Sequence, residues 1–426
     1  MVNRRLICVG TCLFLFLALP FLAYAERWII DYPGNISILD LEVSIHQAGG
    51  TLLEAYPELY LVVADFEKRE DTQAVQASGY EVMPDLLLNL RVNEPIPERG
   101  TVGMNDSFYS MQWHLPVIQA DRAWATGVTG AGVRVAVLDT GIWYHHPDLI
   151  PNIDFAASAS FVPGSPDFLD DNGHGTHVAG IIAAANNGWG VVGVAPNAEL
   201  IGVKVLSSDG TGHISWIISG IIHAVNQRAD IINLSVGSYL KKNGNYPYYT
   251  ASEAATLRRT VRKVIDWATS QGVLVVNSAG NAGLNMDQSG NIISIPTEIG
   301  NGVIISATGP CQLRDFDTIT SYTNYGSSLV WMAAPGGDFR YYPYSGWWYD
   351  MVLSTSIDGW MWSSGTSAAA SMVSGVAALV LEKYGPMSPG ELKRILRDSA
   401  DDLGDPGKDR YFGYGRVNAY RAVTCR

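Results

Sequence analysis

Short apolar runs alternate with segments of helical spacing from about Phe108 onward. The runs "VRVAVLDTG", "AELIGVKVL", "DIINLSVG" and "VLVVNSAGN" are bounded by polar or glycine-rich turns. The segments around them, "HGTHVAGIIAAA", "ISWIISGIIHAVNQRA" and "TLRRTVRKVIDWATSQG", have the spacing of helices. Unbroken apolar strands separated by helices are typical of a parallel sheet covered on both faces. The pattern therefore predicts an α/β fold, a three-layer, doubly wound and mainly parallel sheet, over residues 108–426.

Residues 26–95 follow a different pattern, that of a small α+β unit. In chain order, "RWIIDY" is typical of a strand, "SILDLEVSIHQAG" of a helix, "TLLEAYP" and "LYLVVADF" of strands, "EDTQAVQASG" of a polar helix and "YEVMPDLLLNL" of a final strand. This order is the split βαβ arrangement. From Arg91 the sequence becomes rich in proline, glycine and charge without an apolar period, so residues 96–107 are predicted to be a linker.

The first 25 residues have the composition of a secretory signal peptide. Arg4 and Arg5 precede the apolar stretch "LICVGTCLFLFLALPFLAY", and Ala23 and Ala25 form a small-x-small cleavage signal. Cleavage after Ala25 and secretion to the extracellular space are therefore expected, with no stable membrane association afterwards. An uncleaved membrane anchor is the alternative, because the apolar run is long enough to span a bilayer.

Net charge limits the classes of binding partner, and the cysteine content bears on disulfides and on the type of nucleophile. The formal net charge of -13 argues against binding to nucleic acid or to an anionic membrane surface. Of four cysteines, Cys8 and Cys12 lie in the signal peptide, which leaves Cys311 and Cys425. Two cysteines in an exported chain suggest a disulfide that ties the C-terminus to the body of the protein. Neither lies beside a histidine in a motif, so a cysteine nucleophile is not expected.

Four polar residues stand where strands end and helices begin. Asp139 ends "VRVAVLD", His174 lies between two glycines at a helix start, Asn281 follows "VLVVNSAG", and Ser367 opens the small-residue run of "SAAASMVSG". Reactive residues of α/β sheets collect at such positions. Taken singly, Ser367 fits a helix cap, and Asp139 or Asn281 fits a turn former. Together the four fit a serine nucleophile with its helpers.

Acyl transfer explains why these residue types belong together. A serine hydroxyl becomes nucleophilic when a positioned imidazole takes its proton, and a carboxylate fixes the tautomer of that imidazole. The oxyanion that forms then needs hydrogen-bond donors. The Asn281 amide and the backbone N–H of Ser367, at a helix N-terminus, are suited to this role.

The motifs resemble those of the subtilisin family from about Trp113 to Ala422. The matching stretches are "VAVLDTGI", "HPDL", "NGHGTHVAG", "GVAPNAELIGVKVL", "INLSVG", "SAGN", "GTSAAASMVSG" and "YFGYGRVNAYRAV", and the order Asp, His, Ser is that of the family. The resemblance implies a serine endopeptidase that acts through an acyl-enzyme. In it Asp139 orients, His174 is general base and acid, Ser367 attacks and Asn281 donates to the oxyanion. A catalytically inactive peptide-binding relative and an esterase of similar chemistry are the alternatives.

The resemblance also implies how substrate and the N-terminal unit are bound. An extended polypeptide would pair as an added strand with the "LSVG" edge, with a broad preference for apolar or aromatic side chains. The residues expected to form the substrate pocket are Ser235, Val236, Gly237, Ser278, Ala279 and Gly280. The unit at 26–95 resembles the subtilisin propeptide, which assists folding, inhibits by occupying the active site and is then removed. Self-cleavage is expected between about Asn89 and Met104.

The stretch "AAANNGWGVVGVAP" resembles the calcium loop of the family. The resemblance implies a structural calcium ion held by the Asp148 carboxylate, the Asn187 side chain and the carbonyls of Ala185, Trp189 and Val191, which are the oxygen ligands that calcium prefers. A tight helix-to-strand loop without metal is the alternative. No cofactor is expected for catalysis.

Several charged residues near these motifs have less specific interpretations. His145 and His146 are adjacent, and no Cys or HExxH pattern accompanies them, so they predict a surface loop and no zinc site. Asp170 and Asp171 precede the His174 motif. They are expected at the rim of the cleft, where they would favour basic substrate side chains.

Two stretches near Ser367 differ from the usual family pattern. Ser371 and Met372 stand where the family commonly has Pro and His, which predicts a less rigid first part of the helix. Before the helix, "GGDFRYYPYSGWWYDMVLSTSIDGWMW" is dense in aromatic residues. It is interpreted as a hairpin that packs its own rings, with an aromatic wall of the cleft as the alternative.

Overall fold

A mainly parallel sheet forms the centre of the larger unit. The computed structural model describes residues 27–90, 108–245 and 247–425. The strand order is β17-β16-β14-β10-β6-β8-β7 with β18 beside β16, and every neighbouring pair except β16 with β17 is parallel. The strands are β6 (Arg134–Asp139), β7 (Ala159–Ser160), β8 (Glu199–Lys204), β10 (Ile231–Leu234), β14 (Leu274–Ser278), β16 (Val303–Gly309), β17 (Thr318–Ile319) and β18 (Met332–Pro335). The predicted doubly wound α/β fold is confirmed.

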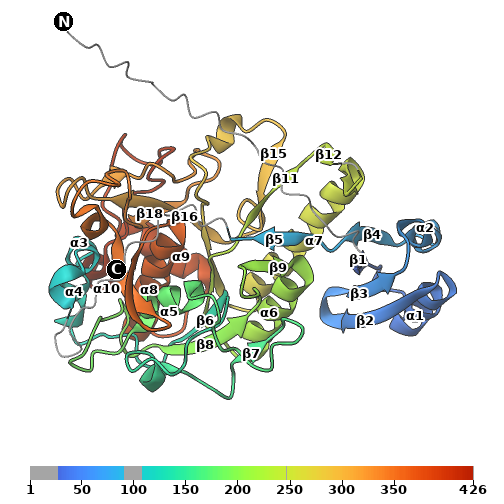
Figure 1. The fold of residues 1–426 in the computed structure, drawn as a ribbon, viewed down its shortest axis with the longest axis horizontal. Coiled ribbons are helices and arrows are strands. Elements are labelled where there is room, and N and C mark those ends of the chain that lie inside the picture. Colours follow the sequence, from blue (N-terminus) through green and yellow to red (C-terminus); the bar gives the residue numbers. More distant parts are fainter. Residues whose placement is uncertain (1–26, 91–107, 246, 426) are drawn as a thin grey trace, which may run out of the picture.

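Helices cover both faces of this sheet (Figure 1). One face carries α5 (His174–Ala183), α8 (Thr366–Tyr384), α9 (Pro389–Asp398) and α10 (Ala419–Thr424), with α3 (His114–Val117) and α4 (Ala120–Trp124) beside them. The other face carries α6 (Ile214–Asn226) and α7 (Ala251–Ser270). Helix α8 is buried over most of its length because small and apolar residues lie on all its sides. It forms the centre of one core and carries Ser367 at its start.

Shorter strands surround the sheet. β9 (Thr211–His213) precedes α6, β11 (Ser238–Lys241) pairs with β15 (Ile292–Ile295), and β12 (Gly244–Asn245) pairs with β13 (Tyr249–Thr250). β19 (Val352–Ser356) and β20 (Gly359–Ser363) form an antiparallel hairpin. The hairpin interpretation is therefore confirmed for the last part of the aromatic stretch only. Before it, Trp347–Asp350 form a 3-10 helix, and the Trp360 ring packs against Phe108 and His146, which lie outside the stretch.

The connections place a switch point beside β6. The chain passes from β6 to β8 on one side and then returns to β10 on the other side of β6. Binding sites of open α/β sheets lie at such points, outside the carboxyl ends of the strands. β6 ends at Asp139, so this residue stands at the switch point.

The N-terminal unit is a four-stranded antiparallel sheet of order β2-β3-β1-β4. Its elements are β1 (Arg27–Asp31), α1 (Ile38–Gln47), β2 (Gly50–Tyr56), β3 (Leu61–Phe66), α2 (Thr72–Ala77) and β4 (Glu81–Pro84). This is the order predicted from the sequence. The two helices share one core with the sheet, while side chains such as Ile29 and Val63 on its other face pack with α6 and α7 of the larger unit.

The expected final strand of this unit is in fact two strands. β4 belongs to the small sheet, whereas β5 (Leu87–Asn89) pairs with β9 of the larger unit. Between them Asp85 is fully buried, and its carboxylate accepts hydrogen bonds from the backbone N–H (2.8 Å) and hydroxyl (2.6 Å) of Ser215, at the start of α6. This contact turns the chain away from the small sheet, which the apolar pattern alone does not reveal.

Two further features concern export. Cys311 and Cys425 are both free thiols, so the suggested disulfide is wrong; the Cys311 Sγ lies 3.1 Å from the Tyr341 hydroxyl instead. In the described part of the chain, no helix combines the length and the apolar character needed to cross a bilayer. The expected signal peptide and the whole of the expected linker lie outside the described residues.

Candidate active site

The carboxylate that ends β6 meets the histidine that begins α5. The Asp139 side chain is fully buried, and its Oδ1 lies 2.7 Å from the His174 Nδ1. Gly175 allows this approach, because a Cβ there would lie 2.1 Å from the carbonyl oxygen of Gly141. A carboxylate at Nδ1 favours the tautomer with its proton on that atom. The Nε2 of His174 is then the atom able to accept a proton.

The start of α5 is held by a second buried carboxylate. Asp170 is fully buried, and its Oδ1 accepts N–H bonds from Asn172 (3.0 Å) and Gly173 (2.9 Å). Its Oδ2 accepts hydrogen bonds from the backbone N–H (2.9 Å) and hydroxyl (2.5 Å) of Thr176. The expected place of Asp170 at the rim of the cleft is therefore wrong. The first helical N–H groups need acceptors, and Asp170 supplies the acceptor for that of Thr176 as well as for the two N–H groups that precede the helix.

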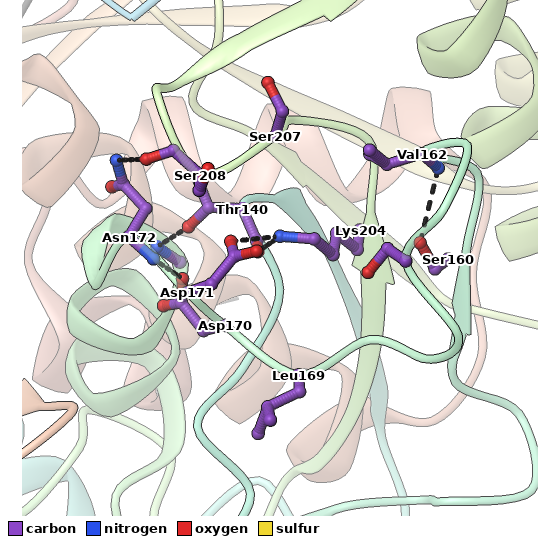
Figure 2. A network of polar contacts seen from close by, with 12 residues as sticks. Thr140, Ser160, Val162, Leu169, Asp170, Asp171, Asn172, Lys204, Ser207 and Ser208 are labelled. Atoms are coloured by element: carbon purple, nitrogen blue, oxygen red, sulfur yellow. Dashed lines mark hydrogen bonds and ion pairs between the residues drawn. The ribbon is translucent and has the colours of Figure 1, made fainter.

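Lys204 is a residue near this site that sequence reasoning missed. Its side chain is fully buried at the end of β8, and its ammonium lies 2.5 Å from the Thr140 carbonyl oxygen and 2.6 Å from the Asp171 Oδ1 (Figure 2). Asp171 is half-exposed but is held by this ion pair. A lysine within the apolar run "ELIGVKVL" was the signal that could have found it, because a buried ammonium requires polar partners.

Ser367 is the second residue of α8 and not its cap. The N-cap position is Gly365, which has no side chain with which to cap the helix. The backbone oxygen of Ser367 accepts hydrogen bonds from the Ser371 hydroxyl at 2.8 Å and from the Ser235 hydroxyl at 3.4 Å. Met372 is fully buried. The Ser371 hydroxyl therefore bonds back to the preceding turn of α8, at the position where the resemblance predicts a less rigid helix.

The Asn281 side chain is pinned by the residue before Ser367. Its Oδ1 accepts bonds from the Thr366 backbone N–H at 2.9 Å and the Thr366 hydroxyl at 2.7 Å. The same hydroxyl accepts the N–H of Gly280 at 3.0 Å. With Oδ1 engaged in this way, Nδ2 is the half of the amide that remains for donation to a ligand. Thr366 was also missed, although it stands in the quoted motif "GTSAAASMVSG".

One pocket brings the sequence-predicted residues together. His174, Asn281 and Ser367 line it, and Asp139 lies behind His174. Of the six residues expected in the substrate pocket, Ser235, Gly237, Ser278 and Gly280 line it, whereas Val236 and Ala279 are buried behind the wall. The lining residues that the sequence did not indicate include Leu90, Tyr239, Ser294 and Thr297.

A strand of the N-terminal unit runs into this pocket. β5 pairs antiparallel with β9, with Leu87 opposite His213 and Asn89 opposite Thr211. The next N–H, that of Leu90, donates to the Gly210 carbonyl oxygen at 2.8 Å, and Leu90 itself lines the pocket beside Ser367. An extended segment of polypeptide therefore occupies the approach to the serine as an added strand, which is a common mode of peptide binding.

Comparison with known proteins fits this geometry. The model of the subtilase family of peptidases matches residues 130–415, well over half of the chain. The chain belongs to the subtilase family. Subtilisin BL of Lederbergia lenta is 40% identical over 314 residues, which cover 74% of this subtilase and 99% of that protein. The thermostable alkaline protease of Halalkalibacterium halodurans is 30% identical over 424 residues, which cover 99% of each. The protein is a subtilisin-type serine protease.

Solved structures show the same fold. The epidermin leader peptide processing serine protease of Staphylococcus aureus aligns with a TM-score of 0.77 at 22% identity, over 94% of this subtilase and 98% of that chain. A lanthipeptide protease aligns with a TM-score of 0.65 at 29% identity, over 74% of this subtilase and 96% of that chain. The first alignment includes most of the N-terminal unit.

The residues expected to hold calcium gather in one place but make other contacts. The Asp148 Oδ2 accepts N–H bonds from Val191 at 3.0 Å and from the Trp360 indole at 2.7 Å, and Asn187 donates to its Oδ1 at 3.3 Å. The Asn187 Oδ1 accepts the N–H of Trp189 at 2.9 Å. N–H groups around a carboxylate present hydrogen atoms, whereas calcium needs oxygen lone pairs. This donor set does not fit calcium.

The two adjacent histidines differ in burial. His145 is exposed, as expected of a surface loop, but His146 is buried, so that part of the expectation is wrong. The His146 Nδ1 accepts the N–H of Asp148 at 3.1 Å, and its Nε2 donates to the Gly359 carbonyl oxygen at 2.8 Å. Burial lowers the pKa of His146. In the described parts of the chain, no group of three or more His, Cys, Asp or Glu residues could hold a metal ion.

Proposed function

We propose that this subtilase is a secreted serine endopeptidase in which Asp139, His174 and Ser367 form the catalytic triad and Asn281 donates to the oxyanion. The observation that carries the proposal is the 2.7 Å contact between His174 and a fully buried Asp139, at a pocket that His174 shares with Ser367 and Asn281. A hydrogen-bonded base beside a serine at a helix start is the arrangement that nucleophilic acyl transfer requires.

The proposed reaction proceeds through an acyl-enzyme. His174 Nε2 takes the proton of the Ser367 hydroxyl as Ser367 Oγ attacks the peptide carbonyl. The oxyanion receives hydrogen bonds from the Asn281 Nδ2 and the Ser367 backbone N–H, aided by the positive end of α8. His174 then gives its proton to the leaving amine, and a water molecule hydrolyses the ester by the reverse sequence. Asp139 stays ionised and stabilises the imidazolium.

The substrates that this site fits best are extended polypeptides. β5 supplies the template, because it approaches Ser367 as a strand paired with β9. Its Leu88 is 2% exposed and faces an apolar pocket formed by α6, α7 and β15. The residues that form this pocket are Ile214, Ile217, Ile218, Ile221, Val261, Val264, Ile295 and Pro296. A substrate with an aliphatic side chain two residues before the Leu90 position would bury the same surface.

The N-terminal unit is proposed to be an inhibitory propeptide that the enzyme removes. Its Asp31 and Glu81 form ion pairs with Lys263 (2.8 Å) and Arg259 (2.9 Å) on α7, and Leu90 occupies the pocket. Substrate cannot use the β9 edge while β5 is paired with it. Self-cleavage is proposed within residues 89–104, which lie mostly outside the described residues, and removal of the signal peptide is proposed to follow Ala25.

Hydrolysis of a fluorogenic peptide or casein by the processed protein tests the catalytic proposal. Ser367→Ala is expected to reduce kcat by about six orders of magnitude, the size known for loss of the nucleophile in subtilisin. Ser270→Ala, a serine replacement on α7, is the matched control and should leave activity unchanged. Equal activity of Ser367→Ala and wild type would contradict the assignment. An inactive wild type that still binds peptide would favour the peptide-binding alternative.

Intact mass and N-terminal sequencing test the zymogen proposal. Wild type is expected to convert to a form that begins between residues 90 and 104, while purified Ser367→Ala stays full length. Added wild type should then cleave Ser367→Ala in the same segment. Purified Ser367→Ala that loses its N-terminal unit without added enzyme would overturn self-cleavage.

A further inference from the structure

Trp360 connects the β19–β20 hairpin to a buried carboxylate. Its indole N–H donates to the Asp148 Oδ2 at 2.7 Å, although the two residues are 212 positions apart. The ring makes edge contacts with Phe108, centroid to centroid 5.1 Å, and with His146, centroid to centroid 5.4 Å. The indole is therefore fixed by two aromatic neighbours as well as by its hydrogen bond.

The Asp148 carboxylate is compensated by N–H groups alone in the contacts found around it. It is fully buried, and an isolated buried carboxylate is costly. Val191 and Trp360 donate to its Oδ2, and Asn187 donates to its Oδ1. Hydrogen bonds to the charged form are what stabilise a buried carboxylate in the absence of a cation.

The space beside the Asp148 Oδ2 is already filled. A Cβ at Gly190 would lie 2.2 Å from the Trp360 Nε1 and 2.3 Å from the Asp148 Oδ2, and the φ of Gly190 is +47°. Calcium binds oxygen ligands at about 2.3 to 2.6 Å. The indole N–H and the N–H of Val191 therefore already take up lone pairs of the Asp148 Oδ2.

Two of the other expected ligands accept hydrogen bonds within the loop. The Asn187 Oδ1 accepts the Trp189 N–H, and the Ala185 carbonyl oxygen accepts the Asn187 N–H at 3.0 Å. The Ala185 N–H in turn donates to the Asp148 carbonyl oxygen at 2.7 Å. Backbone amide N–H groups of the protein thus already engage the oxygen atoms of Asn187 and Ala185.

We propose that the Trp360 indole takes the place of the calcium ion that the sequence resemblance implies, so that the loop of residues 185–191 is anchored to the hairpin without metal.

The same anchor holds the start of the larger unit. The Phe108 N–H donates to the Gly190 carbonyl oxygen at 2.6 Å, and the Phe108 side chain is 1% exposed. Phe108 shares a small core with Ala184, Val191 and Leu353, and Trp360 packs against that core. Self-cleavage is proposed within residues 89–104, so Phe108 would lie close to the new N-terminus, and this cluster would retain that end of the mature enzyme after processing.

Calcium binding and thermal unfolding of the full chain carrying Ser367→Ala test the proposal, since this background avoids self-digestion. Isothermal titration with calcium chloride is expected to detect no calcium binding that is lost in Asp148→Asn. The apparent Tm in EGTA should equal that in excess calcium. A rise in Tm with calcium that disappears in Asp148→Asn would overturn the proposal, because the carboxylate would then be a metal ligand.

Trp360→Phe in the same background isolates the indole N–H, because it keeps an aromatic ring. The apparent Tm is expected to fall by roughly 3 °C or more, with calcium present or absent, because a hydrogen bond to a buried charge is lost. Trp362→Phe is the matched control on the same strand and should change Tm less. Equal Tm values for Trp360→Phe and wild type would overturn the anchoring role. The calcium titration of the parent chain keeps the proposal testable even if Trp360→Phe folds poorly.

Discussion

The candidate active site at the end of β6 and the loop around Asp148 each contain a buried carboxylate. They differ in how far along the chain the hydrogen-bond partner of that carboxylate lies. Asp139 pairs with His174, which lies 35 residues away in the next motif of the chain. Asp148 pairs with Trp360, which lies 212 residues away in a hairpin outside the matching motifs. The motifs quoted from the sequence contain both partners of the first contact, and they contain only one partner of the second.

The β19–β20 hairpin contacts both regions. On β19, Thr355 donates its hydroxyl to the Thr176 carbonyl oxygen at 2.7 Å, and Ser354 donates to that of His177 at 2.8 Å. A Cβ at Gly180 would lie 2.2 Å from the Thr355 hydroxyl oxygen. One strand of the hairpin thus packs tightly on the helix that begins with His174, while the other anchors the Asp148 loop.

Among variants that keep Asp139, His174 and Ser367, the largest effect is expected from Asn281→Ala. It removes the donor that Thr366 holds in place, so kcat should fall by about 100-fold to 1000-fold, the range known for loss of such a donor in subtilisin, with KM nearly unchanged. Steady-state kinetics with a peptide substrate measures this, and the unchanged Tm of the variant serves as control. A change in KM alone would place Asn281 in substrate binding.

The contact between α5 and the hairpin should make stability depend on pH. Burial lowers the pKa of His177 from 6.5 to about 4, with the nearby His174 as a smaller cause, and its Nε2 lies 3.2 Å from the Val352 carbonyl oxygen. Between pH 6.5 and 4 the unfolded chain binds a proton that the folded protein does not. Stability therefore falls as pH falls through this window, by about 3 kcal/mol for this group.

Urea unfolding of the Ser367→Ala chain at pH 6.5 and pH 4.5 measures this effect. His177→Gln should reduce the change in unfolding free energy between the two pH values, whatever its effect at pH 6.5. Part of the change should remain, because burial also lowers the pKa of His114 to about 3. His145→Gln, at an exposed position, should leave the change as it is in the parent. A parent and His177→Gln with the same pH dependence would show that burial does not keep this histidine neutral.

A smaller effect on catalysis is expected from Thr366→Val. The hydroxyl that orients Asn281 is lost while the volume is kept, and kcat should fall about tenfold, as for one neutral hydrogen bond. Thr366→Ser should restore most of the rate. In an Asn281→Ala background the same change should add little, because its target is gone. Additive losses would mean that Thr366 acts independently of Asn281.

The smallest effect is expected from Ser371→Ala. This variant loses the hydrogen bond from the Ser371 hydroxyl to the Ser367 carbonyl oxygen. The free energy of unfolding should therefore fall by about 1 kcal/mol or less, and kcat should stay within about twofold of wild type. Ser388→Ala, which removes a helix cap on α9 far from the site, is the comparison for stability alone. A kcat loss as large as that of Thr366→Val would show that Ser371 is part of the support of the nucleophile.

Sequence patterning predicted the helices and strands around the site because their burial is periodic. The run that ends at Asp139 and the helix that starts at His174 lie where the pattern placed them. Asp170 was misplaced at the rim because its role is to satisfy N–H groups of its own helix start, which its polarity alone does not indicate. His146 was misplaced because the Gly359 carbonyl that it contacts lies in the distant hairpin.

The amino-acid pattern alone was enough to predict the α/β fold, the split βαβ order of the N-terminal unit and the four polar residues of the candidate active site. Each of these depends on short-range signals, namely burial period, glycine turns and the identity of residues at strand ends. Only the tertiary structure decided the pairing of β5 with β9, the burial of Lys204 and the approach of Trp360 to Asp148. These contacts join segments far apart in the chain, and their free energy depends on which groups packing brings within hydrogen-bond distance.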